Sequence, residues 1–156
     1  MAAEIKMLED DTEINRSIAL AEEVFTEFEA HDYSEEGIRN FHDFLYGVNM
    51  KHRRVNGSII FWGAYCGGVL AGVCALRDKT HISLLFVKKE FQRMGIGRLL
   101  TDTACRYVRD TFGIANVTLN SSPYGLPFYK AVGFIPTDME RIDDGIIYTP
   151  MVKNLY

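Results

Sequence analysis

Two glycines one residue apart, Gly95 and Gly97, stand between a strand-like apolar run, HISLLFV, and a long amphipathic segment. Glycines at such a junction let the backbone approach an anion closely, and the first amides of the following helix point toward it. The positive end of the helix dipole adds to this attraction. Arg93 and Arg98 flank the glycines. Residues 92–100 therefore predict a phosphate or pyrophosphate site.

Two well-known phosphate motifs do not fit this stretch. A P-loop requires G-x-x-x-x-G-K-[ST], and no Lys-Ser or Lys-Thr pair stands at that place. A dinucleotide fingerprint requires G-x-G-x-x-G, but Leu100 occupies the position of the third glycine. No well-placed ribose-binding acid follows either. Both interpretations fail on these residues.

The pattern Gln92-x-x-Gly95-x-Gly97, between a strand and a helix, resembles the acetyl-CoA loop of the GNAT superfamily of N-acetyltransferases, [RQ]-x-x-G-x-[GA]. The strand before it and the helix after it match the family as well. The convincing resemblance covers about residues 59–134, and the order of elements extends it to both ends of the chain.

A second segment, SSPYGLPFYKAVGF, resembles the second landmark of the family, N-x-x-A-x-x-x-Y-x-x-x-G-F. Tyr129, Gly133 and Phe134 match that pattern, whereas Ser122 stands where Asn is common and Gly125 where Ala is common. Two landmarks in the correct order, each preceded by a suitable strand, make the resemblance specific.

The resemblance implies acetyl-CoA as the cosubstrate, with no metal. It also places pantetheine beside the backbone of the run LLFV, like an added strand, where an N–H would serve the thioester oxygen. The candidate cofactor-binding residues are Leu85, Phe86, Val87, Gln92, Arg93, Met94, Gly95, Ile96, Gly97, Arg98 and Ser122.

Acetyl transfer to an amine needs an unprotonated nucleophile, a donor for the developing oxyanion and a proton for the leaving thiolate. Tyr129 is the candidate general acid, because a phenol with a pKa near 10 is protonated at neutral pH and the matching family tyrosine has this role. The alternative is a tyrosine that packs the short helix onto the sheet.

The general base is less well defined. His81 occupies the position at which the histone-acetylating branch carries a carboxylate, and an imidazole suits that work. The alternatives are a hydrogen-bonded histidine at a strand end, with water carrying the proton away. Glu27 and Glu29 are weaker candidates, because charged residues on a helix are usually solvated.

The acceptor pocket is expected to involve Phe25, Phe28 and Trp62, although aromatic residues at helical spacing more often form core. Such a pocket favours a small primary amine with an apolar or aromatic body, acetylated by direct transfer in a ternary complex. The alternatives are a protein lysine or N-terminus, or a non-catalytic acetyl-CoA sensor. The basic run KHRR, residues 51–54, is either an exposed loop or an attractant for an acidic group. A homodimer paired through the C-terminal strands is plausible.

The bulk composition restricts the class of protein. The chain has 156 residues, which suits one domain spanning residues 1–156. A net charge of -4 and a pI near 5.6 argue against a nucleic-acid partner. No apolar run approaches the roughly 20 residues that a membrane span needs, and no signal peptide is evident. Three cysteines without CxxC spacing suggest a reducing cytoplasm and no zinc site.

Periodicity predicts an α/β (α+β) domain with a central mixed, mostly antiparallel sheet of about seven strands and about four flanking helices. The resemblance to the GNAT superfamily further implies that the sheet splays at the acetyl-CoA site, between HISLLFV and NVTLN. Pro150 predicts an edge or a bulge in the last strand. Further expectations are a helix capped by Asp11 or Thr12, a helix from Ser34 with Ile38, Phe41 and Leu45 inward, a loop over residues 49–57, and a hairpin at Asp144-Gly145.

Overall fold

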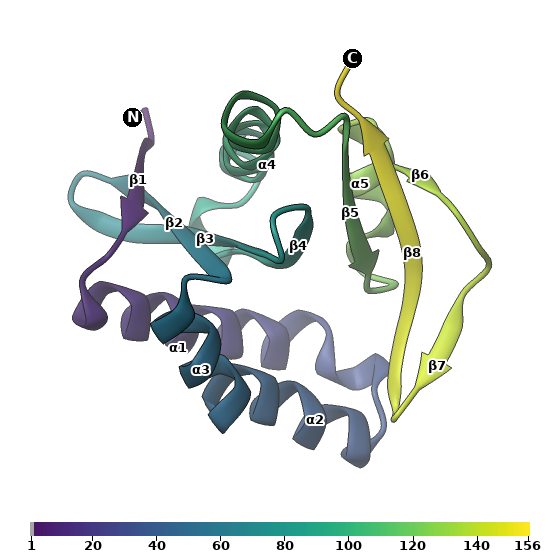
Figure 1. Cartoon of the computed structure of the whole chain (residues 1–156). Coiled ribbons are helices and arrows are strands. Elements are labelled where there is room, and N and C mark those ends of the chain that lie inside the picture. The colour runs from purple at the N-terminus through teal and green to yellow at the C-terminus, as the bar shows by residue number, and fades with distance from the viewer. Residues whose placement is uncertain (1) are drawn as a thin grey trace.

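The computed structural model describes residues 2–156, which form one mixed sheet of eight strands with helices on both faces (Figure 1). Neighbouring strands follow the order β1-β2-β3-β4-β5-β8-β6, and β7 pairs with β8. The strands are β1 Glu4–Leu8, β2 Ile59–Cys66, β3 Val69–Arg77, β4 His81–Val87, β5 Asn116–Ser121, β6 Ile135–Pro136, β7 Arg141–Asp143 and β8 Ile146–Asn154. The helices are α1 Asp11–Phe28, α2 Glu35–Tyr46, α3 Val48–Asn56, α4 Ile96–Tyr107 and α5 Leu126–Ala131, with short turns η1 Ala30–Asp32, η2 Lys89–Phe91 and η3 Val108–Phe112.

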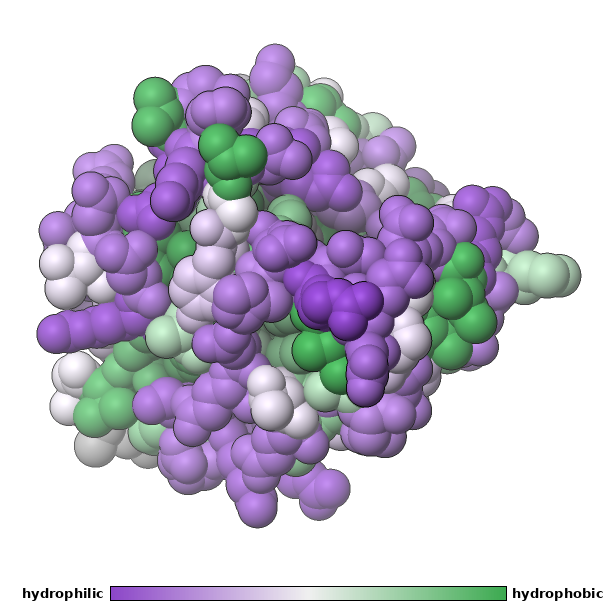
Figure 2. All heavy atoms as spheres, turned by 90° about the horizontal axis from the view of Figure 1, so that it is seen from below, coloured by the Kyte–Doolittle hydropathy of each residue, from purple (hydrophilic) through white to green (hydrophobic). Residues whose placement is uncertain are grey.

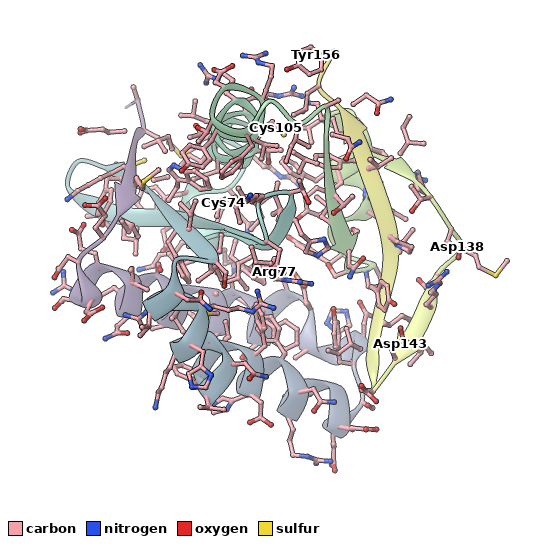
Figure 3. The ribbon with its side chains drawn as sticks, viewed as in Figure 1. Cys74, Arg77, Cys105, Asp138, Asp143 and Tyr156 are labelled. Atoms are coloured by element: carbon pink, nitrogen blue, oxygen red, sulfur yellow. The ribbon has the colours of Figure 1, made fainter. Side chains whose placement is uncertain are left out.

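The helices divide the core into two layers, because the central strands are apolar on both faces. α4 covers one face, and α1, α2 and α3 lie along the other (Figure 1). Leu100 and Ala104 of α4 pack with Leu76 in the first layer, and Phe25 packs with Leu84 in the second. Cys74 of β3 and Cys105 of α4 are buried free thiols in the first layer (Figure 3). No helix within residues 2–156 is long and apolar enough to cross a membrane.

The sheet is split between β4 and β5, as the sequence led us to expect. These parallel strands pair only at His81–Thr118 and Ile82–Leu119 and then diverge. On the other side of β4, the pairing with β3 skips Ser83, which forms a β-bulge. β5 keeps an unbroken antiparallel register with β8. The edge of β4 from Ser83 to Val87 therefore faces β5 without a backbone partner.

The prediction of a loop over residues 49–57 is wrong, because most of this region forms α3. Gly57 adopts a left-handed conformation and ends the helix. Met50 is its one buried residue, so its apolar stripe is too short to be recognised in the sequence. Ion pairs of Arg53 with Asp78 and of Arg54 with Asp11, both at 2.9 Å, hold it in place. These two arginines of the KHRR run thus serve the fold, across the sheet from α4 (Figure 1).

Three smaller expectations also differ from the structure. The N-cap of α1 is Asp10, and its side chain makes no capping bond. Ser34 does cap α2, accepting a hydrogen bond from the Gly37 N–H at 3.1 Å, but Ile38 in the same helix is 39% exposed. The hydrophobic stripe of α2 is therefore narrower than the spacing suggested.

Pro150 lies neither at an edge nor at a bulge. β8 is flanked by β5 on one side and by β6 and β7 on the other. The Pro150 carbonyl accepts from the Thr137 N–H at 2.9 Å, so the side of this residue that lacks an N–H faces the chain between β6 and β7. The ladder is interrupted there, and the missing donor costs nothing.

Candidate active site

The split between β4 and β5 opens into a cavity of about 1040 Å³. Its first end lies at the N-terminus of α4, where Val87 and the loop of residues 92–98 form the wall. Its middle is bounded by Leu85, Glu29 and the segment joining β5 to α5. Its far end lies beside the start of β4, near residues of α2 and of the β7–β8 hairpin. One cavity therefore runs past the glycine loop, the strand β4 and the second landmark, all of which the sequence singled out.

The loop before α4 has the shape of an anion cradle. Arg93 and Gly95 adopt left-handed conformations with φ values of 63° and 81°, which turn successive amides toward one side. The Gln92 side chain donates to the Val87 carbonyl at 3.0 Å, so it ties the loop to the end of β4. The first amides of α4 lack intrahelical partners. Of the loop residues named from the sequence, Met94 alone does not line the cavity, and it is half exposed.

α5 packs directly against this loop. A Cβ at Gly97 would lie 3.1 Å from the Phe128 ring, so the glycine lets the ring rest on the first turn of α4. Phe128 in turn packs edge-on against Tyr129, with ring centroids 5.4 Å apart. The two sequence landmarks, separated by about thirty residues, thus form one wall of the cavity.

Tyr129 lines the middle of the cavity. Burial raises the pKa of its phenol above the ordinary value, and the nearby charge of Glu29 raises it further. The phenol therefore keeps its proton at neutral pH. Its backbone is held by a bond from the Tyr129 N–H to the Gly125 carbonyl at 3.1 Å and one from the Phe134 N–H to the Tyr129 carbonyl at 2.9 Å. A protonated donor thus stands beside the open edge of β4.

Glu29, at the C-terminal end of α1, lines the same part of the cavity. Burial raises the pKa of its carboxyl group to about 7, the charge of Asp32 adds to this shift, and the Ser122 hydroxyl opposes it. Sequence reasoning ranked this residue low, because a glutamate on a helix is usually solvated. The tertiary structure instead turns it into the cavity.

His81 lies near the far end of the cavity, where β4 still pairs with β5. Its Nδ1 lies 2.9 Å from the Thr118 hydroxyl. Burial lowers the pKa of the imidazole to about 4, and the charge of Arg77 contributes to this shift while that of Asp78 opposes it. The ring is therefore neutral at physiological pH but a weak proton acceptor.

Ser83 is a residue that sequence reasoning missed. It lies at the β4 bulge and lines the cavity, and its buried Oγ has no hydrogen-bond partner within residues 2–156. A buried hydroxyl without a partner is unfavourable, so such a group is often reserved for a ligand. The signal in the sequence was a lone serine within the apolar run HISLLFV.

Aromatic rings from α1, α2 and β4 form one wall of the cavity. Phe25 stacks on Phe41 with centroids 4.0 Å apart, and Phe41 packs near Phe86 at 6.0 Å. Of the three aromatic residues proposed for the acceptor pocket, Phe25 lines the cavity. Phe28 does not line it but stacks on Tyr124, which does.

Trp62 lies elsewhere in the molecule. It is 3% exposed and packs edge-on against Tyr107 of α4, at a centroid distance of 5.3 Å. It belongs to the core layer beneath α4 and does not line the cavity. We therefore leave it out of the proposed acceptor pocket.

The far end of the cavity is bordered by the β7–β8 turn, which docks on the first turns of α2. The Asn40 amide donates to the Asp144 carbonyl at 2.7 Å. Arg77 and Asp143, which both line this end, lie on either side of the space between β4 and β8 (Figure 3). From below, the surface is mainly hydrophilic, and hydrophobic atoms show in a recess near its centre (Figure 2). The far end thus has polar residues at its rim and aromatic rings on its wall.

The titratable groups of the cavity do not form a metal site. Within residues 2–156, no three His, Cys, Asp or Glu side chains are grouped so that they could hold a metal ion. The cavity lining includes the titratable side chains of Glu29, His81 and Tyr129 and the free edge of β4.

A split sheet with a glycine loop at the start of the following helix defines an acyl-CoA-dependent transferase fold. The family model described as Acetyltransferase (GNAT) domain matches residues 29–155. The chain belongs to this family, and it is an acetyl-CoA-dependent N-acetyltransferase.

Solved structures share the fold over nearly the whole chain. A GCN5-related N-acetyltransferase from Rhodopseudomonas palustris is 19% identical, with a TM-score of 0.82 over 99% of this chain and 96% of that one. The PaiA N-acetyltransferase from Thermoplasma acidophilum, solved with coenzyme A, is 24% identical, with a TM-score of 0.79 over 99% of both chains. The spermidine/spermine N-acetyltransferase SpeG from Vibrio cholerae is 12% identical, with a TM-score of 0.65 over 98% and 92%. A comparison with curated proteins finds no match.

Proposed function

We propose that this N-acetyltransferase transfers the acetyl group of acetyl-CoA directly to a primary amine of a small molecule, with both substrates bound at once. One continuous cavity supports direct transfer, because molecules that enter from its two ends would meet in its middle, beside the open edge of β4. Acetyl-CoA would enter at the α4 end, and the amine would enter at the opposite end. No covalent acyl-enzyme is needed when the two substrates meet in this way.

The residues at the α4 end fit the pyrophosphate of acetyl-CoA. The amides of residues 93–98 and the N-terminus of α4 would hold its negative charge, with Arg93 and Arg98 lining the same wall. Gly95 leaves open space on this wall, since a Cβ there would meet nothing within 4 Å. Gln92 would act on the loop conformation through its bond to Val87.

The free edge of β4 fits the pantetheine arm. Leu85, Phe86 and Val87 have no strand partner on the β5 side. Alternate residues of a strand point their peptide groups to opposite sides, and the Lys88 N–H donates to the Ala71 carbonyl on the β3 side. The peptide groups of Leu85 and the N–H of Val87 can therefore pair with the amides of the arm, whereas Phe86 pairs with Val73 of β3. A backbone N–H at this edge would stabilise the negative charge that develops on the thioester oxygen. Tyr129 would give the leaving thiolate its proton.

The observation that carries the choice of a small acceptor is the docking of the β7–β8 turn on α2. The Asn40–Asp144 hydrogen bond closes the side of the cavity along which an extended polypeptide would have to lie. The stacked rings of Phe25 and Phe41 line the space that remains. Such a pocket favours an amine with an apolar or aromatic body.

A thiol-release assay with acetyl-CoA tests this proposal. The panel contains small aliphatic and aromatic primary amines, together with peptides that carry a free N-terminus or a lysine. We expect turnover of small amines and little with the peptides. A preference for peptides over every small amine would contradict the proposed acceptor class.

Tyr129→Phe tests the role of the phenol in the same assay. We expect it to lower kcat about 100-fold with little change in acetyl-CoA affinity, because the hydroxyl acts on the leaving group. Tyr156→Phe, the same change at a residue that is 80% exposed, is the control and should leave kcat unchanged. A Tyr129→Phe protein with the wild-type rate would remove the phenol from the reaction.

A further inference from the structure

The end of α1 is fixed against the segment that joins β5 to α5. The Phe28 ring stacks on the Tyr124 ring, with centroids 5.2 Å apart and an interplanar angle of 26°. Glu29 follows Phe28, and its backbone is held by a bond from its N–H to the Phe25 carbonyl at 2.9 Å. The Asp32 N–H donates to the Glu29 carbonyl at 3.0 Å. Glu29 is therefore attached to a rigid junction, from which its side chain lines the cavity.

The Ser122 hydroxyl lines the same cavity as this carboxyl group. The Ser122 Oγ accepts a hydrogen bond from the Gly125 N–H at 3.1 Å. Its own proton is therefore free to be donated, and both Ser122 and Glu29 line the cavity. The hydroxyl lowers the pKa of the Glu29 carboxyl group, against the larger effect of burial. The absence of a side chain at Gly125 makes this arrangement possible, since a Cβ there would lie 3.3 Å from the Ser122 Oγ and 3.0 Å from the Tyr129 ring.

Three further titratable groups surround Glu29. Asp32 from η1 raises the pKa of the Glu29 carboxyl group. The charge of Glu29 raises the pKa of Tyr33 and of Tyr129. Since both phenols keep their protons at neutral pH, Glu29 is the group of this cluster that can take up a proton there.

We propose that the Glu29 carboxylate accepts the proton of the acceptor amine, and that the Ser122 hydroxyl positions this carboxylate. The inference rests on the acetyl transfer proposed above and assigns the proton acceptor of that reaction. It replaces His81 in this role, because the His81 ring lies beside the paired start of β4 and is the weaker acceptor.

Two protons and one bond exchange are accounted for in the proposed reaction. The acceptor binds as an ammonium ion and gives one proton to the Glu29 carboxylate. The nitrogen lone pair then forms a bond to the thioester carbon, and the carbon–sulfur bond breaks. The sulfur leaves with the proton of Tyr129, and the second proton of the nitrogen returns to the Tyr129 phenolate. Glu29 finally releases its proton to water, which restores both residues.

The test compares Glu29→Gln with Glu27→Gln. Glu27 is two residues earlier on the same helix, is exposed, and contacts Lys89 at 3.5 Å rather than the cavity. We expect Glu29→Gln to lower kcat/KM at neutral pH about 100-fold, with acetyl-CoA affinity unchanged. Glu27→Gln should behave as wild type. Equal effects of the two substitutions, or none at Glu29, would overturn the proposal.

The pH dependence separates a proton acceptor from a structural carboxylate. With an amine whose own pKa is well above 7, wild-type kcat/KM should rise with pH and level off near pH 7, where Glu29 ionises. In Glu29→Gln the rise should continue to the pKa of the free amine, because only the unprotonated amine then reacts. A variant that is slower but keeps the wild-type profile would show that Glu29 has a structural role.

Ser122→Ala tests the positioning role. We expect kcat to fall about tenfold and the bend of the profile to move to higher pH, because the substitution removes a donor that favours the ionised carboxylate. Ser122→Thr keeps a hydroxyl and should restore most of both properties. An unshifted bend in Ser122→Ala would remove Ser122 from the proposal.

The panel of amines and peptides separates a failure of the Glu29 proposal from a failure of the proposed acceptor class. The Glu29 variants are measured with whichever amine wild type turns over, small molecule or peptide. Turnover of peptides alone, with the loss at Glu29→Gln, would contradict the small acceptor and support Glu29. Turnover of small amines with no loss of rate in Glu29→Gln would support the small acceptor and contradict the role of Glu29. If wild type acetylates neither kind of amine, both proposals are overturned.

Discussion

The backbone of Gly37, in the first turn of α2, lies directly against the carbonyl of Gly145 in the β7–β8 turn. A Cβ at position 37 would collide with that carbonyl and lie 3.2 Å from the Ile146 nitrogen. Gly145 has φ of 77° and no room for a side chain, because Ser34 and Gly37 occupy the space. Two segments about a hundred residues apart in the chain thus meet backbone to backbone, and their contact forms one wall at the far end of the cavity.

Gly37→Ala should open this contact. Alanine favours a helix over glycine by about 1 kcal/mol, but the clash with the Gly145 carbonyl outweighs this gain. We expect a net loss of about 1–3 kcal/mol in the free energy of unfolding and a higher KM for the acceptor with unchanged acetyl-CoA affinity. Denaturant unfolding and steady-state kinetics measure both. Glu36→Ala, on the exposed side of the same turn, is the control, and an equal effect there would refute the explanation.

Gly95→Ala should weaken acetyl-CoA binding through the loop conformation. Gly95 and Gly113, at opposite ends of the α4 region, have φ values of 81° and 65°, and a Cβ at either would meet nothing within 4 Å. Alanine at each should therefore cost about 1–2 kcal/mol in stability. Only Gly95→Ala should raise the dissociation constant of acetyl-CoA, about tenfold, as measured by calorimetry. Equal affinities in the two variants would show that the loop amides do not hold the cofactor.

His81 should make the fold sensitive to acid. Its pKa is lowered from 6.5 to about 4, so the unfolded chain binds a proton between these values that the folded chain does not. Stability is present above pH 6.5 and is lost as the pH falls toward 4. His81→Gln removes this pH dependence. When the pH is lowered from about 7.5 to about 5, the free energy of unfolding of the variant should therefore rise by about 2 kcal/mol relative to that of wild type. Chemical unfolding at the two pH values measures it, and a constant difference would contradict the burial of His81.

Glu29 should change the stability with pH in the opposite direction. Its pKa is raised from 4.5 to about 7, so the folded chain holds a proton that the unfolded chain releases. The stability that this group contributes is present below pH 4.5 and is lost as the pH rises through 7. Glu29→Gln should therefore stabilise the protein, and by about 2 kcal/mol more at pH 8 than at pH 5. Glu27→Gln measured alongside should show no such trend.

Ser83→Ala should separate stability from acceptor binding. Removing a buried hydroxyl without a partner should stabilise the fold by about 1 kcal/mol. If the acceptor uses this hydroxyl, its KM should rise about tenfold while acetyl-CoA affinity stays the same. Ser121→Ala is the control, because the Ser121 hydroxyl is also buried but donates to the Ser122 carbonyl at 2.8 Å. We expect that variant to lose stability. A Ser83→Ala protein with unchanged KM would exclude contact with the acceptor.

Local sequence was sufficient for much of the cofactor end of the site. The loop around Gly95, the helix after it and the tyrosine of the second landmark depend on neighbours a few residues away, so spacing alone places them. The split of the sheet was expected on a different ground, the resemblance of the segments around β4 to the family. The missed helix α3 had a single buried residue, Met50, and thus almost no periodic signal.

The acceptor end was decided by contacts between distant segments. Glu27 lies in the last turn of α1 and Glu29 is the residue at which this helix ends, and the sequence determined only that both carry a carboxylate. Two residues turn a helix by about 200°, so side chains two apart near a helix end point in different directions. Which of them faces the cavity depends on how Phe28 stacks on Tyr124 and how α1 packs beneath β4. The environment that shifts the pKa of Glu29 exists only after Ser122, Asp32 and Tyr129 have been brought around it by the fold.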